Sequence, residues 1–156
     1  MEVANWTNCR ANFAYDDGAL VDLIAPGTGM AEWETFWAAL RSGLFALKAC
    51  RDGESIPLPE SAAWIMAERE VASVMVSVMA GTLTANCHFF GGDLELDIDP
   101  REVVSESAFE SVLALMRFVA GAVGRPVLAV PEGGNSEHAF LSVSPSGQAW
   151  FLPPRG

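Results

Sequence analysis

Apolar and polar residues alternate in three consecutive segments near the middle of the chain. The segments span residues 71–80, 83–90 and 93–99, and short turns that contain glycine separate them. A period of two is typical of β-strands that bury one face and leave the other open. The pattern therefore predicts an antiparallel three-stranded meander, whose third strand ends at Pro100.

Two longer segments carry apolar residues at helical spacing. The first spans residues 30–50 and follows a Gly- and Pro-containing turn. Its apolar stripe consists of Trp33, Phe36, Trp37, Leu40, Leu44 and Leu47. The second spans residues 106–123, where Ser105 is placed to cap the helix and Gly124 and Pro126 are placed to end it. Both patterns predict helices that pack on a core.

Shorter elements are expected in the rest of the chain. Residues 12–15 and 19–24 flank the turn at residues 16–18 and predict a β-hairpin, and residues 61–67 predict a short helix. Three short strands are expected at residues 127–130, 139–143 and 149–152.

The order of these elements predicts the fold class. Strands occur in runs that two long helices separate, which is typical of an α+β fold with a largely antiparallel sheet. We expect the element order ββα–βββ–αβββ, with both long helices packed on one face of the sheet. The length of 156 residues and the hydrophobic fraction of 51% fit a single domain, residues 1–156, with a substantial core.

Turn positions predict the register of the meander. If Gly91 and Gly92 form a two-residue turn, residues whose numbers sum to 183 lie opposite each other. The apolar pairs are then Phe89 with Leu94, Cys87 with Leu96 and Ala85 with Ile98. The polar pairs are His88 with Glu95, Asn86 with Asp97 and Thr84 with Asp99. A slip of one residue would mix the two sets, so the clean separation favours this register.

Negative charge is concentrated in residues 93–110, which begin with the third strand of the meander. The chain has 20 acidic and 9 basic residues, a net charge of −11. Residues 93–110 contain seven acids and one base, and therefore supply −6 of this charge. Such a field repels nucleic acid and anionic membranes and attracts basic partners, although solubility alone also accounts for an acidic surface.

The polar face also receives exposed sulfur and aromatic side chains, which suit adaptable interfaces. These side chains favour a partner-binding face, and a solvated sheet face and a cation site are the alternatives. The expected residues of the partner-binding face are Asp93, Glu95, Asp97, Asp99 and Glu102, with His88, Met75 and Phe90 as further contacts.

Catalytic and metal chemistry find little support in the pattern. Cys87 and His88 are neighbours in a predicted strand, so their side chains point to opposite faces and cannot form a nucleophile–base dyad. His88, Glu95 and Asp97 form at most part of a metal site, since zinc needs three or four converging ligands. The alternating acids lack the glycine of a calcium loop. We predict no catalytic residue, metal or cofactor.

Cysteine usage and hydropathy indicate a cytoplasmic location. The three cysteines, Cys9, Cys50 and Cys87, show no CxxC spacing, which fits a reducing compartment. The most apolar windows, residues 71–80 and 112–123, are shorter than the roughly 18 residues of a membrane span. No apolar secretory segment stands near residue 1, so neither export nor membrane insertion is expected. Nothing in the pattern indicates an oligomeric state.

The second half of the chain resembles a known group of proteins. Four segments carry the likeness: His88-Phe89-Phe90, the acidic stretch of residues 94–102, the helix with Phe109 and Leu113, and residues 124–127. Together they resemble small acidic bacterial immunity-type proteins, some of which are encoded beside toxins. The resemblance implies an antitoxin role, in which a folded inhibitor occludes the active site of a toxin, and it carries over no catalytic residues.

Our first hypothesis is therefore an immunity protein that inhibits a cognate basic toxin through the acidic sheet face. Carboxylates can mimic phosphate and speed association with the basic cleft of a toxin that acts on nucleic acid. A second hypothesis is a small carboxylate- or metal-dependent enzyme, which requires converging carboxylates in a concave, partly buried site. A third is a regulatory or scaffold binding module, for which the acidic face is only solvated.

Overall fold

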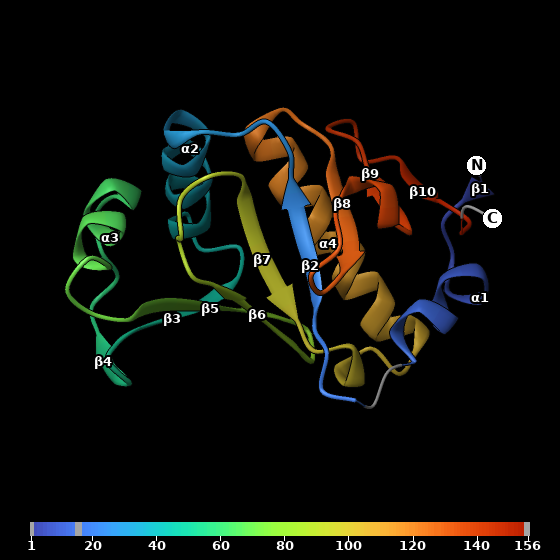
Figure 1. The fold of residues 1–156 in the computed structure, drawn as a ribbon, viewed down its shortest axis with the longest axis horizontal. Coiled ribbons are helices and arrows are strands. Elements are labelled where there is room, and N and C mark those ends of the chain that lie inside the picture. Colours follow the sequence, from blue (N-terminus) through green and yellow to red (C-terminus); the bar gives the residue numbers. More distant parts are fainter. Residues whose placement is uncertain (1, 15–16, 155–156) are drawn as a thin grey trace.

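The computed structural model describes residues 2–14 and 17–154, which form an α+β fold on one ten-stranded antiparallel sheet (Figure 1). The strands are β1 (Glu2–Val3), β2 (Val21–Ala25), β3 (Ala46–Arg51), β4 (Glu54–Ile56), β5 (Val74–Ala80), β6 (Leu83–Cys87), β7 (Leu94–Ile98), β8 (Val127–Pro131), β9 (Leu141–Val143) and β10 (Ala149–Phe151). Their order across the sheet is β1-β10-β9-β8-β2-β7-β6-β5-β3-β4. The predicted α+β class and the antiparallel sheet are confirmed.

Helices and short helical turns join the strands. The α-helices are α1 (Trp6–Cys9), α2 (Met30–Arg41), α3 (Ala62–Glu68) and α4 (Glu106–Val123). The 3-10 turns are η1 (Arg10–Phe13), η2 (Pro100–Glu102) and η3 (Ser136–His138). None of the helices in the described part of the chain is long and apolar enough to cross a lipid bilayer.

Strand β2 occupies the middle of the sheet, between β7 and β8 (Figure 1). It pairs with β7 so that Asp22 lies opposite Asp97 and Ile24 lies opposite Glu95. Its other edge pairs with β8, which begins soon after α4 ends. An early segment of the chain thus joins the acidic strand to the strands near the carboxy terminus.

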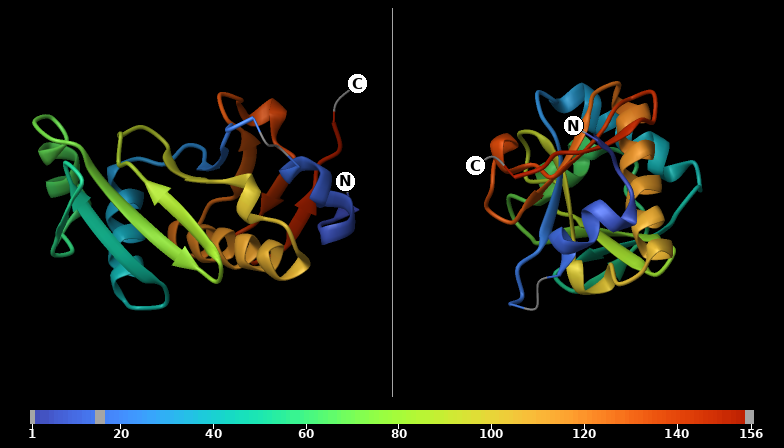
Figure 2. Two further views of the ribbon diagram at one scale, coloured as in Figure 1. Left: turned by 90° about the horizontal axis from the view of Figure 1, so that it is seen from below. Right: turned by 90° about the vertical axis from the view of Figure 1, so that its right-hand side faces the viewer.

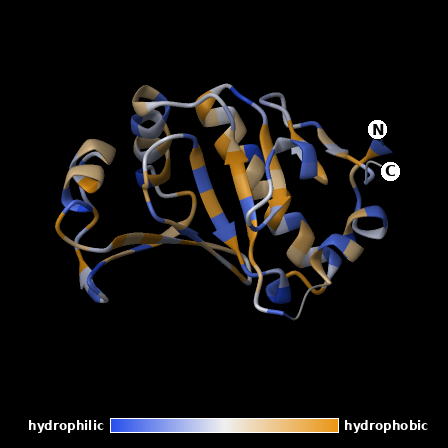
Figure 3. Cartoon of the chain, in the orientation of Figure 1, coloured by the Kyte–Doolittle hydropathy of each residue, from blue (hydrophilic) through white to orange (hydrophobic). Residues whose placement is uncertain are grey.

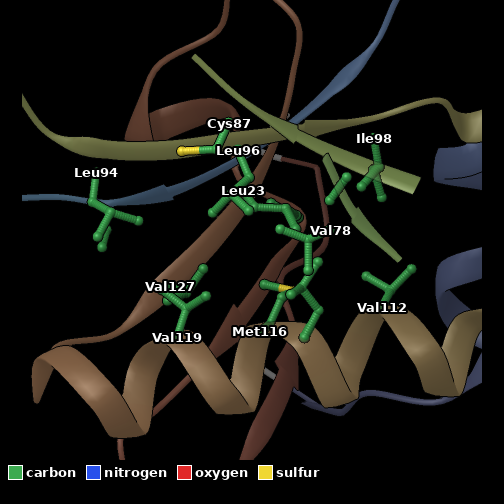
Figure 4. Close-up of a cluster of buried hydrophobic side chains, with 14 of the residues drawn as sticks. Leu23, Val78, Cys87, Leu94, Leu96, Ile98, Val112, Met116, Val119 and Val127 are labelled. Atoms are coloured by element: carbon green, nitrogen blue, oxygen red, sulfur yellow. The ribbon is translucent and has the colours of Figure 1, made fainter. Parts of the chain in front are cut away.

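The long helix α4 covers one face of the sheet (Figures 1 and 2). The Ser105 hydroxyl accepts a hydrogen bond from the Ala108 N–H at 3.1 Å, and Gly124 ends the helix with a φ of 68°. Both ends of this helix are therefore as predicted. Figure 4 shows Val112, Met116 and Val119 of α4 directed at apolar side chains of the sheet.

The aromatic residues of α2 belong to the core, as expected. Trp33, Phe36 and Trp37 are buried. The ring of Phe89 lies 5.0 Å from that of Trp33 and 5.7 Å from that of Trp37, measured between centroids. Such pairs add to the free energy gained by burial, so they fix α2 to the end of β6.

The predicted helix over residues 30–50 is too long. Helix α2 ends at Arg41, and Gly43 follows with a φ of 99°, a conformation that favours glycine. Residues 46–51 instead form β3, which pairs with β5 along six residue pairs. Leu44 is 67% exposed, so the helical stripe does not continue into this segment. Pairing with a distant strand has overridden a local helical pattern.

The predicted hairpin over residues 12–24 is also wrong where it can be checked. Residues 10–13 form η1, and β2 pairs with β7 and β8. Tyr15 and Asp16 lie outside the described residues. The additional strands β1, β3 and β4 mean that the element order ββα–βββ–αβββ is not the observed one.

The central meander is confirmed, with a different turn. Ala85 lies opposite Ile98 and Asn86 opposite Asp97, the predicted register. Beyond these pairs β6 and β7 separate, so residues 88–93 form a loop in place of the two-residue turn at Gly91 and Gly92. Phe89 has a φ of 54°, which is uncommon for a bulky residue and turns the chain out of the β6 direction.

The remaining predicted elements are close to those observed. Ser61 caps α3 by accepting a hydrogen bond from the Trp64 N–H. The three strands expected near the carboxy terminus are β8, β9 and β10, each shifted by a residue or two at its ends.

Candidate functional site

The outer face of the sheet, on the side opposite α4, carries the candidate site. Residues of β7 alternate between buried Leu94, Leu96 and Ile98 and the outward Glu95 and Asp97. In the hydropathy colouring of Figure 3, β7 shows alternating apolar and polar bands. The alternation in sequence thus places two carboxylates over a rigid, well-packed sheet.

Three carboxylates from two strands meet at the centre of this face, and we call Asp22, Glu95 and Asp97 the central acidic cluster. Asp22 comes from β2 and is the direct cross-strand neighbour of Asp97. Glu95 and Asp97 are two residues apart on β7 and therefore share a face. The cluster brings like charges together on adjacent strands, an arrangement that destabilises a sheet unless something neutralises it.

Partial burial, and after it that repulsion, raise pKa values within the cluster. Partial desolvation, then the nearby Asp22 carboxylate, raise the pKa of Glu95 to about 7. Desolvation also raises the pKa of Asp22, while its hydrogen bond with Glu95 opposes the rise. The cluster therefore holds a proton at near-neutral pH that an isolated carboxylate would release.

His88 pairs with Asp97 at one side of the cluster. Its Nε2 lies 3.2 Å from the Asp97 Oδ2. The predicted register placed His88 opposite Glu95, but the loop after β6 turns the imidazole toward Asp97 instead. The Asn86 amide donates a hydrogen bond to the other Asp97 oxygen at 3.5 Å, and Ser77 donates to Asn86 at 3.0 Å. This polar row runs from β5 to β7.

An exposed aromatic stack borders the cluster. The rings of His88 and Phe90 stack with centroids 5.1 Å apart and an interplanar angle of 8°. The Arg69 guanidinium carbon lies 4.4 Å from the Phe90 ring centroid, a cation–π contact. Phe90 is nevertheless 72% exposed. An aromatic side chain held in place but open to solvent resembles the anchors of protein interfaces.

The core holds the loop that presents Phe90. Phe89 is buried while its neighbour Phe90 is exposed. The Trp33 indole N–H donates a hydrogen bond to the Gly92 carbonyl at 3.0 Å, which ties the loop to α2. Because Phe89 has a positive φ, its own ring lies in the core while the ring of Phe90 lies at the surface.

A small pocket of about 50 Å³ lies between this loop and β7, lined by His88, Phe90, Glu95 and Asp97 among others. Ligand sites usually have volumes of roughly 300–1,000 Å³, so it has room for a single small group and no substrate molecule. Among the described residues, no three His, Cys, Asp or Glu side chains converge as metal ligands.

The other predicted contact residues lie around the cluster but have structural partners. The Asp93 carboxylate accepts a hydrogen bond from the Gly27 N–H at 2.9 Å. Asp99 binds the Arg101 guanidinium at 2.7 Å, and this hydrogen bond lowers the pKa of Asp99. Glu102 accepts from the Thr84 N–H at 3.2 Å. Met75 lies two strands away on β5, half-buried and opposite Cys50.

Sequence reasoning missed Asp22 and Arg69. The alternation in β2 shows that Asp22 points away from the core, but only the pairing of β2 with β7 shows that it joins the cluster. Arg69 follows the end of α3, and no sequence signal connects it with Phe90.

A second hollow, of about 610 Å³, lies beside η3 and the carboxy-terminal segment. His138 and Glu137 line it, together with apolar and proline residues. His138 Nδ1 accepts a hydrogen bond from the Asn135 N–H, so the ring serves the local turn. The hollow contains no nucleophile–base arrangement among the described residues.

Comparison of the chain with protein-family models, with curated proteins and with solved structures found no match.

Proposed function

We propose that this chain is a binding protein of the immunity or antitoxin type, which inhibits a basic protein toxin by holding it on the outer sheet face. The observation behind the proposal is the central acidic cluster, where partial burial and then repulsion from the neighbouring carboxylates raise the pKa of Glu95 to about 7. A cationic partner would relieve that repulsion, so part of the free energy lost in forming the cluster is recovered on binding.

The geometry of the face supports a protein partner. The cluster lies on paired strands over a packed core, so binding orders little backbone. Phe90 adds an exposed aromatic anchor beside the carboxylates, and Arg69 and His88 hold its ring. If the toxin acts on nucleic acid, the carboxylates of the cluster take the place of phosphates in its basic cleft.

We also propose a bacterial cytoplasmic location, because the three cysteines are free and two of them, Cys9 and Cys87, are buried. Burial raises the pKa of the Cys9 thiol to about 11, so it stays protonated and unreactive at neutral pH.

The proposal is tested by comparing three baits in extracts of the cells that encode the chain. The baits are the wild type, the double variant Glu95→Lys with Asp97→Lys, and a matched control, Glu106→Lys with Glu110→Lys. The control residues are exposed on α4, which covers the opposite face. We expect one basic protein to bind the wild type and the control at low salt and to be lost from the double variant.

The captured protein is then expressed alone and together with each bait. We expect growth arrest when it is expressed alone, relief by the wild type and the control, and no relief by the double variant. A harmless captured protein, or equal capture by all three baits, contradicts the proposal. Glu95→Lys alone serves the same test if the double variant does not fold, because Glu95 is exposed.

A small enzyme that uses the Asp22–Glu95 pair is the second candidate. A carboxyl group with a pKa near 7 beside a carboxylate is suited to general acid–base catalysis. The pocket of about 50 Å³ counts against it, because it has too little room for a substrate. Turnover of a carbohydrate ester or glycoside that Glu95→Gln abolishes would favour this candidate. A regulatory or scaffold module, in contrast, would bind its partner without dependence on Glu95 or Asp97.

A further inference from the structure

An apolar groove lies at the edge of the sheet formed by β4, apart from the central acidic cluster. It has a volume of about 570 Å³ and lies between the β4 edge, the proline-containing segment after it and α3. Its apolar lining consists of Ile56, Pro57, Leu58, Pro59 and Trp64. Trp64 is 45% exposed and Leu58 38% exposed. A groove of this size with an open tryptophan is typical of a binding site.

The free edge of β4 provides backbone hydrogen-bonding groups beside this groove. Asp52 and Gly53 form a two-residue hairpin turn with φ values of 49° and 82°. In such a hairpin the pairs Arg51–Glu54 and Ala49–Ile56 exchange hydrogen bonds with each other. The N–H and C=O of Ser55 therefore point away from β3, toward the open edge. Because β4 is the last strand in the order, no described strand takes them up.

Charge decides which occupant fits this edge. Arg51 is already bound to Glu68 at 2.7 Å. Glu60 lines the groove and Glu54 is exposed on β4, and neither side chain forms a salt bridge within the described residues. The Arg41 guanidinium also reaches this rim, where it donates a hydrogen bond to the Glu60 backbone carbonyl at 3.1 Å, so the charges beside the groove nearly balance. The net charge of −11 of the whole chain is what favours a basic occupant. A second copy of the chain, also at −11, would be repelled.

The described ends of the chain do not supply an occupant either. Strands β1 and β10, which carry these ends, lie at the opposite edge of the sheet from β4 (Figure 1). We propose that the groove binds an extended segment of another protein, in which apolar residues alternate with lysine or arginine. The segment adds a strand to β4, bonds to Ser55, and packs apolar side chains on Trp64. This inference does not depend on the function of the acidic cluster.

Proline at position 55 tests the backbone contact. Ser55→Pro removes the N–H that faces the open edge and leaves the β3–β4 ladder intact, since proline is accepted at such edge positions. Ser55→Ala is the matched control, because it keeps the N–H. Both changes are made together with Glu95→Gln and Asp97→Asn, which reduces binding of the probe to the acidic cluster.

The probe is a capped seven-residue peptide of alternating valine and lysine, titrated into isotopically labelled protein and followed by NMR. We expect saturable shifts of the residue 55 amide and the Trp64 indole in the Ser55→Ala protein. Affinity should fall at least tenfold in the Ser55→Pro protein, which lacks that amide and is followed at the indole. The same peptide with methyl groups on alternate backbone nitrogens should also bind at least tenfold more weakly, and this comparison holds even if Ser55→Pro does not fold.

Three results would overturn the inference. One is the absence of a saturable shift up to a peptide concentration of about 1 mM, the limit of weak binding. Another is equal affinity for the methylated and unmethylated peptides. The third is a dimer in sedimentation experiments that Ser55→Pro abolishes, which would assign the edge to a second copy of the chain.

Discussion

Among single residues, Glu95 gives the clearest link between the site and a measurable property. Its pKa is 4.5 without perturbation and about 7 in the folded protein, so between these pH values the folded state binds more protons than the unfolded state. The free energy of unfolding contributed by Glu95 therefore falls as the pH rises through this range. The stabilisation that Glu95 contributes is fully present below pH 4.5 and is lost above pH 7.

We accordingly expect Glu95→Gln to stabilise the protein at pH 8 and to have no such effect near pH 4. The gain should be about 1 kcal/mol or less, because the side chain is exposed and solvent screens the charges. Urea denaturation at a series of pH values measures it. Glu110→Gln, an exposed site on α4, is the control and should show no pH-dependent gain. The quantity to compare is the free energy of unfolding of Glu95→Gln minus that of the wild type. If this difference is smaller at pH 8 than at pH 4, the cluster carries no repulsion.

At the scale of elements, Thr28 joins the segment between β2 and α2 to the start of β7. Its hydroxyl donates a hydrogen bond to the Ala25 carbonyl at 2.7 Å and accepts one from the Leu94 N–H at 2.6 Å. Thr28 is only 7% exposed, so water cannot readily replace either bond. This contact fixes the end of β7 that carries the acidic cluster.

We expect Thr28→Val to lower the free energy of unfolding by about 2 kcal/mol, because it leaves the Leu94 N–H and the Ala25 carbonyl without a partner. Thr28→Ser keeps the hydroxyl and should cost less than half as much. Chemical denaturation measures both. Equal losses for the two variants would mean that the methyl group of Thr28, and not its hydroxyl, stabilises the junction.

The elements that sequence could predict are those whose pattern is set locally. Helix α4 has a capping serine, a continuous apolar stripe and a terminal glycine, and its observed ends are the predicted ones. The segment that forms β3 was misassigned because Leu44 and Leu47 continue the helical spacing of α2. Only its pairing with β5, about 30 residues away, makes it a strand.

The sequence likewise predicts only the part of the candidate site that a local pattern sets. Glu95 and Asp97 could be placed on an outward face because their strand alternates strictly. Asp22 could not be joined to them, because the pairing of β2 with β7 spans more than 70 residues and leaves no local signal. His88 was placed on the correct face, but the loop that turns it toward Asp97 depends on the unusual backbone of Phe89.

At the scale of the whole molecule, the net charge of −11 makes self-repulsion a general property of the folded state. Salt shortens the range of this repulsion to about 10 Å at 0.1 M and less at higher concentrations. Because the compact state holds its charges closer together than the unfolded chain does, screening stabilises it more. We expect the melting temperature at pH 8 to rise by about 2–4 °C between low salt and roughly 0.3 M sodium chloride.

Two variants with equal net charge show where that repulsion is concentrated. Glu95→Gln with Asp97→Asn removes two charges from the central acidic cluster, and Glu106→Gln with Glu110→Gln removes two from α4. If charge were spread evenly, both would reduce the salt dependence equally. The cluster brings its carboxylates together on adjacent strands, whereas Glu106 and Glu110 lie one helical turn apart at an exposed surface. The melting temperature of the cluster variant should therefore respond less to salt than that of the α4 variant. Identical salt responses would mean that the outer face carries no excess repulsion for a partner to relieve.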